Sequence, residues 1–212
     1  VCLMKYFDYA SSAPVEQEIL EKYIGYLKKH FANSESHHPL GVEVRKLLES
    51  SRNKTAALLR VRPNEIIFTS GASEANSMGI KGYALKNRKK GNHIITTSIE
   101  HSSVMNSCAQ LEKDFGFEVT YLPVNADGKV NPDDLAEAIR QDTILVSVMM
   151  VNNESGAIQP IDQIKQIVAR HPGLKLHVDC VQSAGKIPLD LEGIDMASIG
   201  GHKIGGIKGS GV

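Results

Sequence analysis

The 212-residue sequence predicts an α/β fold, an open and mostly parallel sheet flanked by helices. Two observations lead to this prediction. Short runs rich in β-branched residues alternate with segments of helical periodicity. Most of these runs are continuously apolar, which is typical of strands that are buried on both faces of a parallel sheet. Such an alternation implies right-handed crossover connections.

The positions of the predicted helices and strands are given by the spacing of apolar residues along the chain. Helices are expected where apolar residues recur at helical spacing, and strands where short apolar runs lie between them. Asn131-Pro132 and His171-Pro172-Gly173 mark helix boundaries, because proline and glycine interrupt regular structure. The predicted helices are residues 15–30, 42–59, 73–89, 102–115, 132–140 and 161–170, and the predicted strands are residues 66–69, 94–97, 119–122, 143–151, 174–178 and 196–199.

Composition excludes several classes of protein. The 24 basic and 24 acidic side chains cancel (24 − 24 = 0), so no net charge attracts nucleic acid or an anionic membrane. No apolar run approaches the roughly 20 residues of a membrane span, and the N-terminus lacks a signal-peptide layout. The three cysteines, Cys2, Cys108 and Cys180, are odd in number and far apart. We therefore expect a cytoplasmic protein with no disulfide framework.

Polar residues follow five of the predicted strands. In open α/β sheets the ligand lies beyond the carboxyl ends of the strands, so these residues are expected to face one site. A single polar residue after a strand is weak evidence, but five groups at the carboxyl edge of one sheet indicate a ligand-binding site. They are Ser70-Gly-Ala-Ser-Glu74, Glu100 with His101, Asn152-Asn-Glu154, Asp179 with Gln182, and Gly200-Gly-His-Lys203.

Taken singly, most of these residues also fit an ordinary structural role. Residues 70–73 fit a helix cap as well as an anion site at a helix start. His101 alone is more typical of a solvated first-turn histidine, and Lys203 alone of a surface lysine. Asp179 is different, because an acid that closes an apolar strand is costly to bury without a partner.

Asp179 and Lys203, which follow two successive strands, fit one particular cofactor. A lysine amine can form a Schiff base with the aldehyde of pyridoxal phosphate, and a carboxylate can keep the pyridine nitrogen protonated. The helix start at residues 70–73 would take the phosphate, and His101 could stack on the ring. Spacing alone leaves other chemistries open.

The sequence resembles the cysteine desulfurases of pyridoxal-phosphate fold type I, in the class V aminotransferase family and its subgroup with Val-Asn-Asn-Glu. The matching stretches occur in family order and span the chain. They are Phe7-Asp-Tyr-Ala-Ser-Ser-Ala-Pro14, Phe68-Thr-Ser-Gly-Ala-Ser-Glu-Ala-Asn76, Glu100-His-Ser-Ser-Val104, Val151-Asn-Asn-Glu-Ser-Gly156, His177-Val-Asp-Cys-Val-Gln-Ser-Ala-Gly-Lys186 and Gly201-His-Lys203.

The resemblance implies roles for individual residues. Lys203 and His101 are the implied catalytic residues, Lys203 by holding the cofactor and moving the substrate's α-proton. Asp179 would bind the pyridinium nitrogen, and Gln182 the phenolic oxygen. The implied cofactor-binding set is Ala72, Ser73, His101, Asn153, Asp179, Gln182, Gly200, His202 and Lys203, with no metal site.

The sequence departs from the family pattern near the lysine. Gly200 stands where the family usually has a serine whose hydroxyl reaches the phosphate. Gly206-Ile-Lys-Gly209 replaces the usual Gly-Pro-Lys-Gly, and Gly205 replaces a bulkier residue, so we expect a more flexible loop. Ser73 replaces the common threonine.

The resemblance also predicts how the chain is organised. Residues 1–14 are expected near the active site and residues 15–212 to form an incomplete large cofactor-binding domain, with the C-terminal small domain absent. The family's nucleophilic cysteine lies in that later part, and none of the three cysteines here matches it. We therefore expect the 212-residue chain alone not to turn over cysteine.

As a member of this family, the complete protein would convert L-cysteine to L-alanine and pass the sulfur, as a persulfide, to an acceptor or iron–sulfur scaffold protein. The family pattern also implies a homodimer at full length, and no nucleic acid or membrane partner. Alternatives are a related class V aminotransferase, a selenocysteine lyase, or a non-catalytic cofactor-binding partner in sulfur assembly. A nucleotide-binding protein is disfavoured, because no Gly-x4-Gly-Lys-Ser/Thr loop is present.

Overall fold

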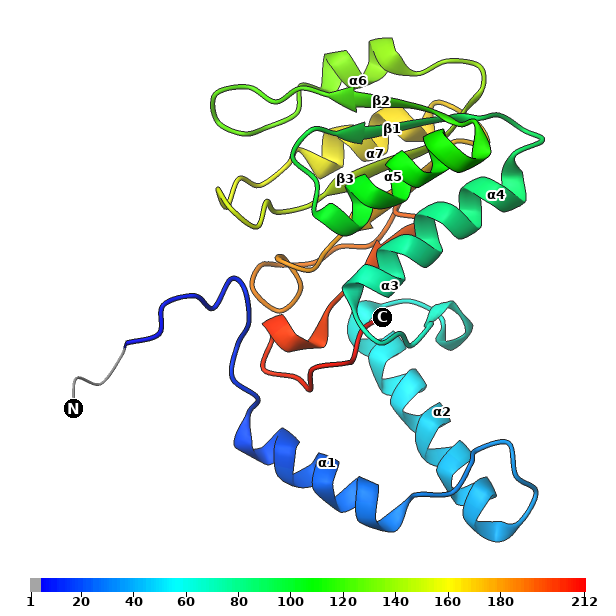
Figure 1. Ribbon diagram of the computed structural model, residues 1–212, viewed down its shortest axis with the longest axis vertical. Coiled ribbons are helices and arrows are strands. Elements are labelled where there is room, and N and C mark those ends of the chain that lie inside the picture. Colours follow the sequence, from blue (N-terminus) through cyan, green and yellow to red (C-terminus); the bar gives the residue numbers. More distant parts are fainter. Residues whose placement is uncertain (1–4) are drawn as a thin grey trace.

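The computed structural model describes residues 5–212 as an α/β layer with a helical arm (Figure 1). Five parallel strands form one sheet in the order β2-β1-β3-β4-β5. This arrangement confirms the predicted open, parallel α/β fold. The strands are β1 (His93–Thr97), β2 (Glu118–Leu122), β3 (Thr143–Met149), β4 (Lys175–Asp179) and β5 (Met196–Ser198).

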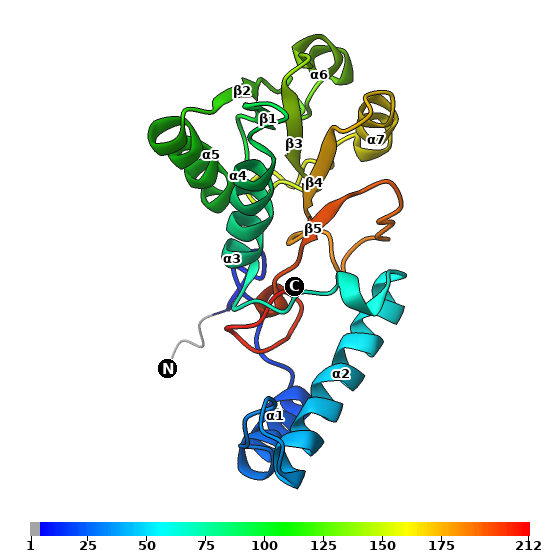
Figure 2. The ribbon, with the colours of Figure 1, turned by 90° about the vertical axis from the view of Figure 1, so that its right-hand side faces the viewer.

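Helices cover both faces of the sheet (Figure 2). On one face, α5 (Ser102–Phe115) and α4 (Tyr83–Asn87) pack against Ile94 and Leu145. On the other face, α6 (Pro132–Ala138) and α7 (Ile161–Ala169) pack against Ile95 and Val146. Neighbouring residues of a strand point to opposite faces, so a strand covered on both sides has to be apolar throughout. Every residue of β1 and β3 is buried accordingly.

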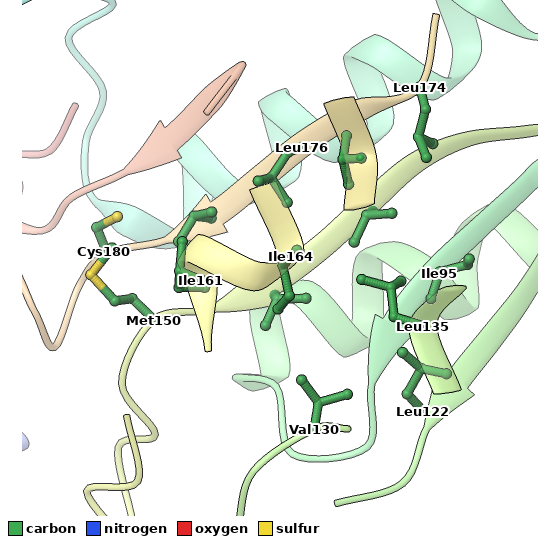
Figure 3. Packing of buried hydrophobic residues seen from close by; sticks show 14 residues of the cluster. Ile95, Leu122, Val130, Leu135, Met150, Ile161, Ile164, Leu174, Leu176 and Cys180 are labelled. Carbon is green, nitrogen blue, oxygen red and sulfur yellow. The ribbon is translucent and has the colours of Figure 1, made fainter. Parts of the chain in front are cut away.

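The larger core cluster lies under α6 and α7 (Figure 3). Leu135 of α6, Ile164 of α7 and Leu176 of β4 are each fully buried in it. The amphipathic spacing of α7 places Ile161, Ile164 and Val168 on its inner face, as a 3.6-residue period requires. The sheet is therefore held by side chains that the sequence pattern identified.

The prediction of a strand at residues 66–69 was wrong. A short 3-10 helix, η1 (Pro63–Glu65), precedes this extended segment, and Thr69 alone forms a bridge, antiparallel to Gly211. Two backbone hydrogen bonds of 2.9 Å join Thr69 and Gly211. The apolar pattern of the segment is that of a strand, but a single bridge is too short a pairing to form a ladder.

The predicted helix at residues 73–89 is one helical run with an irregular centre. It consists of α3 (Ala72–Ser77), a π-helical turn η2 (Met78–Gly82) and α4. A π-helical turn holds more residues than an α-helical turn, so the side chains after it are rotated relative to those before it. A prediction from α-helical periodicity does not detect such a turn. The run brings Asn76 of α3 to the sheet edge, where it is fully buried.

The first two helices extend away from the sheet as an arm (Figure 1). They are α1 (Gln17–Lys29), which begins two residues later than residue 15, and α2 (Pro39–Leu59), which begins three residues before residue 42. Pro39 suits a first helical position, and the His38 side chain accepts a hydrogen bond from the Gly41 N–H. None of the residues of α1 is buried, although it carries Tyr23, Ile24 and Leu27.

Replacing Leu176 by alanine should lower the free energy of unfolding by about 2–5 kcal/mol, because a fully buried leucine leaves a cavity that relaxes only in part. Leu58→Ala is the control, since Leu58 is 84% exposed. Denaturant unfolding followed by circular dichroism measures both variants. Equal losses of stability in the two variants would contradict this description of the core.

Candidate active site

A cavity of about 500 Å³ opens at the carboxyl ends of β3 and β4. Met149 and Asp179, the last residues of these strands, line it. The N-terminal segment, the start of α3, the start of α5 and the loop after β5 complete its wall. The lining residues are Asp8, Ala10, Ser11, Ser70, Gly71, Ala72, Ser73, Glu74, Asn76, His101, Met149, Val151, Asn153, Asp179, Val181, Gln182, His202 and Lys203.

The structure brings eight of the nine predicted site residues to this one cavity. The exception is Gly200, which is not part of the lining. A Cβ atom at Gly200 would lie 3.4 Å from the Ala72 Cβ and 3.4 Å from the His202 ring, and both of these residues do line the cavity. Gly200 therefore stands directly behind the predicted phosphate end of the site.

Asp179 is the most enclosed acid of the cavity, with 4% of its surface exposed. Its Oδ1 accepts a hydrogen bond of 2.9 Å from the Val181 N–H, and its Oδ2 accepts one of 2.8 Å from the Asn76 side-chain amide. A buried carboxylate needs such donors, because removing its hydration without replacement is costly. Both of its oxygens are therefore fixed in direction.

Lys203 lies on a short 3-10 helix, η3 (Gly201–Lys203), that follows β5. Burial lowers the pKa of its amine, and the nearby Lys186 lowers it further, whereas Asp179 and Asp8 act in the opposite direction. A lowered pKa increases the neutral fraction of a lysine, which is the nucleophilic form. The geometry thus places an amine of lowered pKa in the same cavity as the Asp179 carboxylate.

The N-terminal segment holds the lysine loop by backbone hydrogen bonds. The Ala13 N–H donates to the His202 carbonyl and the Glu16 N–H donates to the Gly205 carbonyl, each at 3.0 Å. Gly205 adopts a positive φ of +76°, and a Cβ there would approach Glu16 to 2.9 Å. A bulkier residue at position 205 would therefore displace this contact.

Gln182 is oriented by a lysine that sequence reasoning left out of the site. The Lys186 ammonium donates to Gln182 Oε1 at 2.9 Å, and the Gln182 amide nitrogen donates to the Ala10 carbonyl at 2.8 Å. Because an ammonium can only donate, Oε1 has to face Lys186. One N–H of the Gln182 NH₂ group is thus used by Ala10, and its second N–H has no acceptor among the described residues.

The start of α3 offers free backbone donors. The first intrahelical bond runs from the Ala75 N–H to the Gly71 carbonyl, so the N–H groups of Ala72 and Ser73 have no protein acceptor within residues 5–212. Glu74 Oε2 accepts from both the backbone and the hydroxyl of Ser70. These open donors and the positive helix end form a site that suits an anion.

His101 and His202 flank the same space from two different loops. His101 precedes α5, and its Nδ1 accepts a hydrogen bond of 3.2 Å from the Ser103 N–H. Burial, followed by the charges of Lys203 and Lys208, lowers the pKa of His202. The neutral form of His202 is thereby favoured when the cavity holds no anion.

Sequence reasoning missed several cavity residues and included some that serve only the scaffold. Asp8, Ser11 and Asn76 line the cavity but were not selected. Asn76 could have been found, since it lies one helical turn after Ala72 and Ser73 on the same face. Asn152 does not line the cavity, because its Oδ1 accepts the N–H groups of Glu154 and Ser155 in a turn.

Glu100, also selected as a strand-end residue, is buried beneath the site. Its Oε1 accepts hydrogen bonds from the Thr97 hydroxyl at 2.6 Å and the Met149 N–H at 2.9 Å, and its Oε2 has no partner in the described chain. Burial raises the pKa of the Glu100 carboxyl to about 8. Glu100 thus ties the end of β1 to the end of β3 instead of facing a ligand.

The two cysteines in the described part of the chain are both buried. Cys108 and Cys180 are each 0% exposed, and burial raises the pKa of each thiol to about 12. Cys180 packs in the core near Met150 (Figure 3). Neither thiol has the exposure or the thiolate character of a nucleophile. Cys2 lies outside the described residues.

A second, larger cavity of about 1020 Å³ lies along β5 and does not contain the site. Its lining is mainly apolar and includes Ile66, Met196 and Ile199. His177 borders it and bridges the Ser147 and Ser198 hydroxyls, and burial lowers the pKa of His177 to about 4. This histidine is therefore a neutral core residue.

The fold agrees with the comparisons to known proteins. Residues 5–212 match the family described as Aminotransferase class-V. The chain belongs to this family, whose members are pyridoxal-phosphate enzymes. The family resemblance read from the sequence motifs is thereby confirmed.

Individual relatives narrow the class. The chain is 46% identical over 208 residues to the cysteine desulfurase IscS of Dictyoglomus turgidum, and 45% identical over 208 residues to that of Methanosarcina thermophila. Each match covers 97% of this chain and 52% or 51% of the relative. The chain therefore spans about half the length of the curated relatives it matches.

Solved structures show the same similarity in three dimensions. A structure of SspA in complex with cysteine superposes with a TM-score of 0.93 at 41% identity, and covers 98% of this chain and 60% of its own. A NifS-like protein gives 0.93 at 39% identity, over 97% of this chain and 57% of its own. Both support the α/β fold described above.

The described residues contain neither a metal-ligand cluster nor a helix able to span a membrane. Across residues 5–212, histidine, cysteine, aspartate and glutamate side chains form no group of three or more that could hold a metal ion. Over the same part of the chain, no helix combines the length and apolar character needed to cross a membrane.

Glu100→Gln should make stability less dependent on pH. The folded protein keeps the Glu100 proton up to about pH 8, whereas the unfolded chain releases it near 4.5, so wild-type stability falls as pH rises through this window. Glutamine has the same shape and no proton to lose. The free energy of unfolding of the variant, minus that of wild type, should rise by about 1.4 kcal/mol per pH unit between pH 5 and 8.

Urea unfolding at several pH values measures this difference. Glu154→Gln, the same substitution at an exposed position, should reproduce the wild-type profile. A flat difference for Glu100→Gln would show that the buried carboxyl does not hold its proton.

Proposed function

We propose that this chain is the cofactor-binding part of a pyridoxal-phosphate-dependent cysteine desulfurase. The reaction removes the sulfur of L-cysteine to a cysteine thiol of the enzyme, as a persulfide, and leaves L-alanine. The observation that carries the proposal is the placement of Asp179, Lys203 and the open start of α3 around one cavity. The identity to proteins named cysteine desulfurase supports it.

The residues present fit the cofactor at each of its functional groups. Asp179 supplies a carboxylate for the pyridine nitrogen, and Lys203 an amine for the aldehyde carbon. The N–H groups of Ala72 and Ser73, with His202 beside them, supply donors for the phosphate. When bound, pyridoxal phosphate supplies an electron sink that stabilises negative charge at the substrate α-carbon.

Lys203 would act in two ways. Its burial in the cavity lowers the pKa of the amine, so it can hold the aldehyde carbon covalently at neutral pH. Once substrate takes its place, the same Nζ is free to remove the α-proton and return it. The contacts from Ala13 and Glu16 keep the loop in place for both steps.

Two amide side chains and a histidine would orient the ring. The Gln182 NH₂, turned by Lys186, is a donor for the phenolic oxygen, with Asn153 beside the same space. His101 lines the cavity from the start of α5 and would stack on the ring face. It would also take part in proton transfer to the substrate.

One structural relative supports L-cysteine as the substrate. SspA was solved in complex with cysteine and is 41% identical to this chain. We assign L-cysteine as the substrate on this basis. A related class V aminotransferase or a selenocysteine lyase remains the alternative within the same family, and an assay for alanine and sulfide separates these activities.

We further propose that the complete protein is a cytoplasmic homodimer that passes sulfur to an acceptor or an iron–sulfur scaffold protein. The apolar side chains of α1 support association, because Tyr23, Ile24, Tyr26 and Leu27 are each more than two-fifths exposed. Residues 15–212 would form the cofactor-binding domain, and residues 1–14 would lie near its active site; of these, residues 1–4 lie outside the described residues.

The protein should turn yellow with pyridoxal phosphate, and borohydride should fix the cofactor on Lys203, because Lys203 is the one lysine among the described residues that line the cavity with Asp179. Peptide mass spectrometry of the reduced protein measures the label. Lys208→Ala, an exposed lysine of the same loop, is the control and should keep the label. Labelling that survives Lys203→Ala would overturn the cofactor assignment.

The longest form of the protein that its gene encodes should release alanine from L-cysteine, with sulfide when a reductant is present. The 212-residue chain should not, because Cys108 and Cys180 are too buried to attack the substrate sulfur and Cys2 precedes the first family motif. Alanine is measured by amino-acid analysis. Pyruvate or amino transfer in place of alanine would favour the other activities of the family.

Gly200→Ser should raise the affinity for pyridoxal phosphate by about 2- to 10-fold, the effect of one added hydrogen bond. The space exists, since a Cβ there makes only ordinary contacts and the φ of Gly200 is −115°. Gly200→Ala fills the same space without a hydroxyl and is the matched control. A fluorescence titration measures both, and equal affinities would show that the hydroxyl plays no part.

A further inference from the structure

A chain of hydrogen bonds joins two residues of the proposed site, Asp179 and His101, through the interior. The Asn76 side-chain nitrogen donates to Asp179 Oδ2 at 2.8 Å and to the Ser103 hydroxyl oxygen at 2.9 Å. The Ser103 hydroxyl in turn lies 2.8 Å from His101 Nδ1. Asn76 is completely buried between α3, α5 and β4.

The direction of the first bond is fixed by chemistry. An ionised carboxylate only accepts, so the NH₂ group of Asn76 has to face Asp179. The opposite orientation would place the Asn76 oxygen against the carboxylate. Asn76 Oδ1 has no partner within residues 5–212, so both side-chain hydrogen bonds of Asn76 are made by its nitrogen.

The orientation of Asn76 determines which hydrogen bond the Ser103 hydroxyl donates. Its oxygen accepts from Asn76, so its own O–H proton is free to be donated. The other hydrogen-bond partner of this hydroxyl is His101 Nδ1, which also accepts from the Ser103 N–H at 3.2 Å. A nitrogen that accepts from two donors carries no proton. The proton of neutral His101 must therefore lie on Nε2.

We propose that Asn76 is a positioning residue that, through Ser103, holds the proton of His101 on Nε2 while it holds the Asp179 carboxylate in place. Within residues 5–212, Nε2 of His101 has no protein partner, so its proton is directed to whatever occupies the cavity. The value of this arrangement for the reaction rests on the proposed function. There, His101 becomes a proton donor to bound substrate instead of an acceptor.

The tautomer of His101 can be read directly by NMR. Two-bond ¹H–¹⁵N correlation spectra of the ¹⁵N-histidine-labelled 212-residue chain distinguish a proton on Nε2 from one on Nδ1. The His101 signals are assigned by their loss in His101→Gln. We expect the Nε2–H pattern in wild type. An Nδ1–H pattern there would overturn the proposal.

Variants test whether the chain of bonds sets this tautomer. Ser103→Ala removes the hydroxyl donor, and Asn76→Leu removes the amide that directs it. In both, the ratio of the Nδ1–H form to the Nε2–H form should rise roughly fivefold, the effect of losing one net hydrogen bond. Ser103→Thr keeps a hydroxyl and should restore the wild-type ratio.

Ser107→Ala is the matched control, because Ser107 lies one turn further along α5 and donates to the Ser103 carbonyl at 2.7 Å without touching His101. It should leave the ratio unchanged. If Asn76→Leu fails to fold, the Ser103 pair still decides the question. A ratio that stays at the wild-type value in Ser103→Ala would overturn the proposal.

These spectra need neither cofactor nor cysteine, so the outcome is separate from that of the proposed function. The expected tautomer in a protein whose Lys203 never takes up pyridoxal phosphate would overturn the function and leave this inference standing. Conversely, borohydride labelling of Lys203 together with an Nδ1–H form of His101 would support the proposed function and overturn this inference.

Discussion

A carboxylate at the end of a buried strand has to find its hydrogen-bond donors inside the protein, and much of the site depends on how Asp179 finds them. One donor is the Val181 N–H, which turns the chain directly after β4. The other is Asn76, which requires α3 to begin at the sheet edge. The same amide reaches α5 through Ser103. Three segments distant in sequence are therefore held around one acid.

The polar residues at the strand ends are of two kinds, those that face the cavity and those that bond to the backbone around it. Asp179 faces the cavity and takes its donors from behind, whereas Glu100 and Asn152 use their oxygens to close neighbouring turns. Glu100 binds the Met149 N–H where β3 ends, and Asn152 donates to the Ile99 carbonyl. Buried polar groups that bond to the backbone in this way shape the rim without reaching a ligand.

The sequence was sufficient to predict the parallel sheet, because runs such as residues 94–97 are apolar on both faces and only a covered strand tolerates that. It was also sufficient to bring Asp179, Gln182 and Lys203 together, since parallel strands end at one edge. It could not distinguish residues 66–69 from a strand, because pairing depends on a partner and not on apolar pattern. Helical spacing could have placed Asn76 beside Ala72 and Ser73, but its contacts with Ser103 of α5 and Asp179 of β4 join distant segments and could not be predicted from it.

The two backbone contacts from Ala13 and Glu16 to the lysine loop have a mechanical consequence. Glu16 is the residue directly before α1, so the helical arm and the lysine share a support. The helical arm and the loop that carries Lys203 are therefore joined at Glu16 and Gly205, so a contact that restrains the start of the arm also restrains this loop.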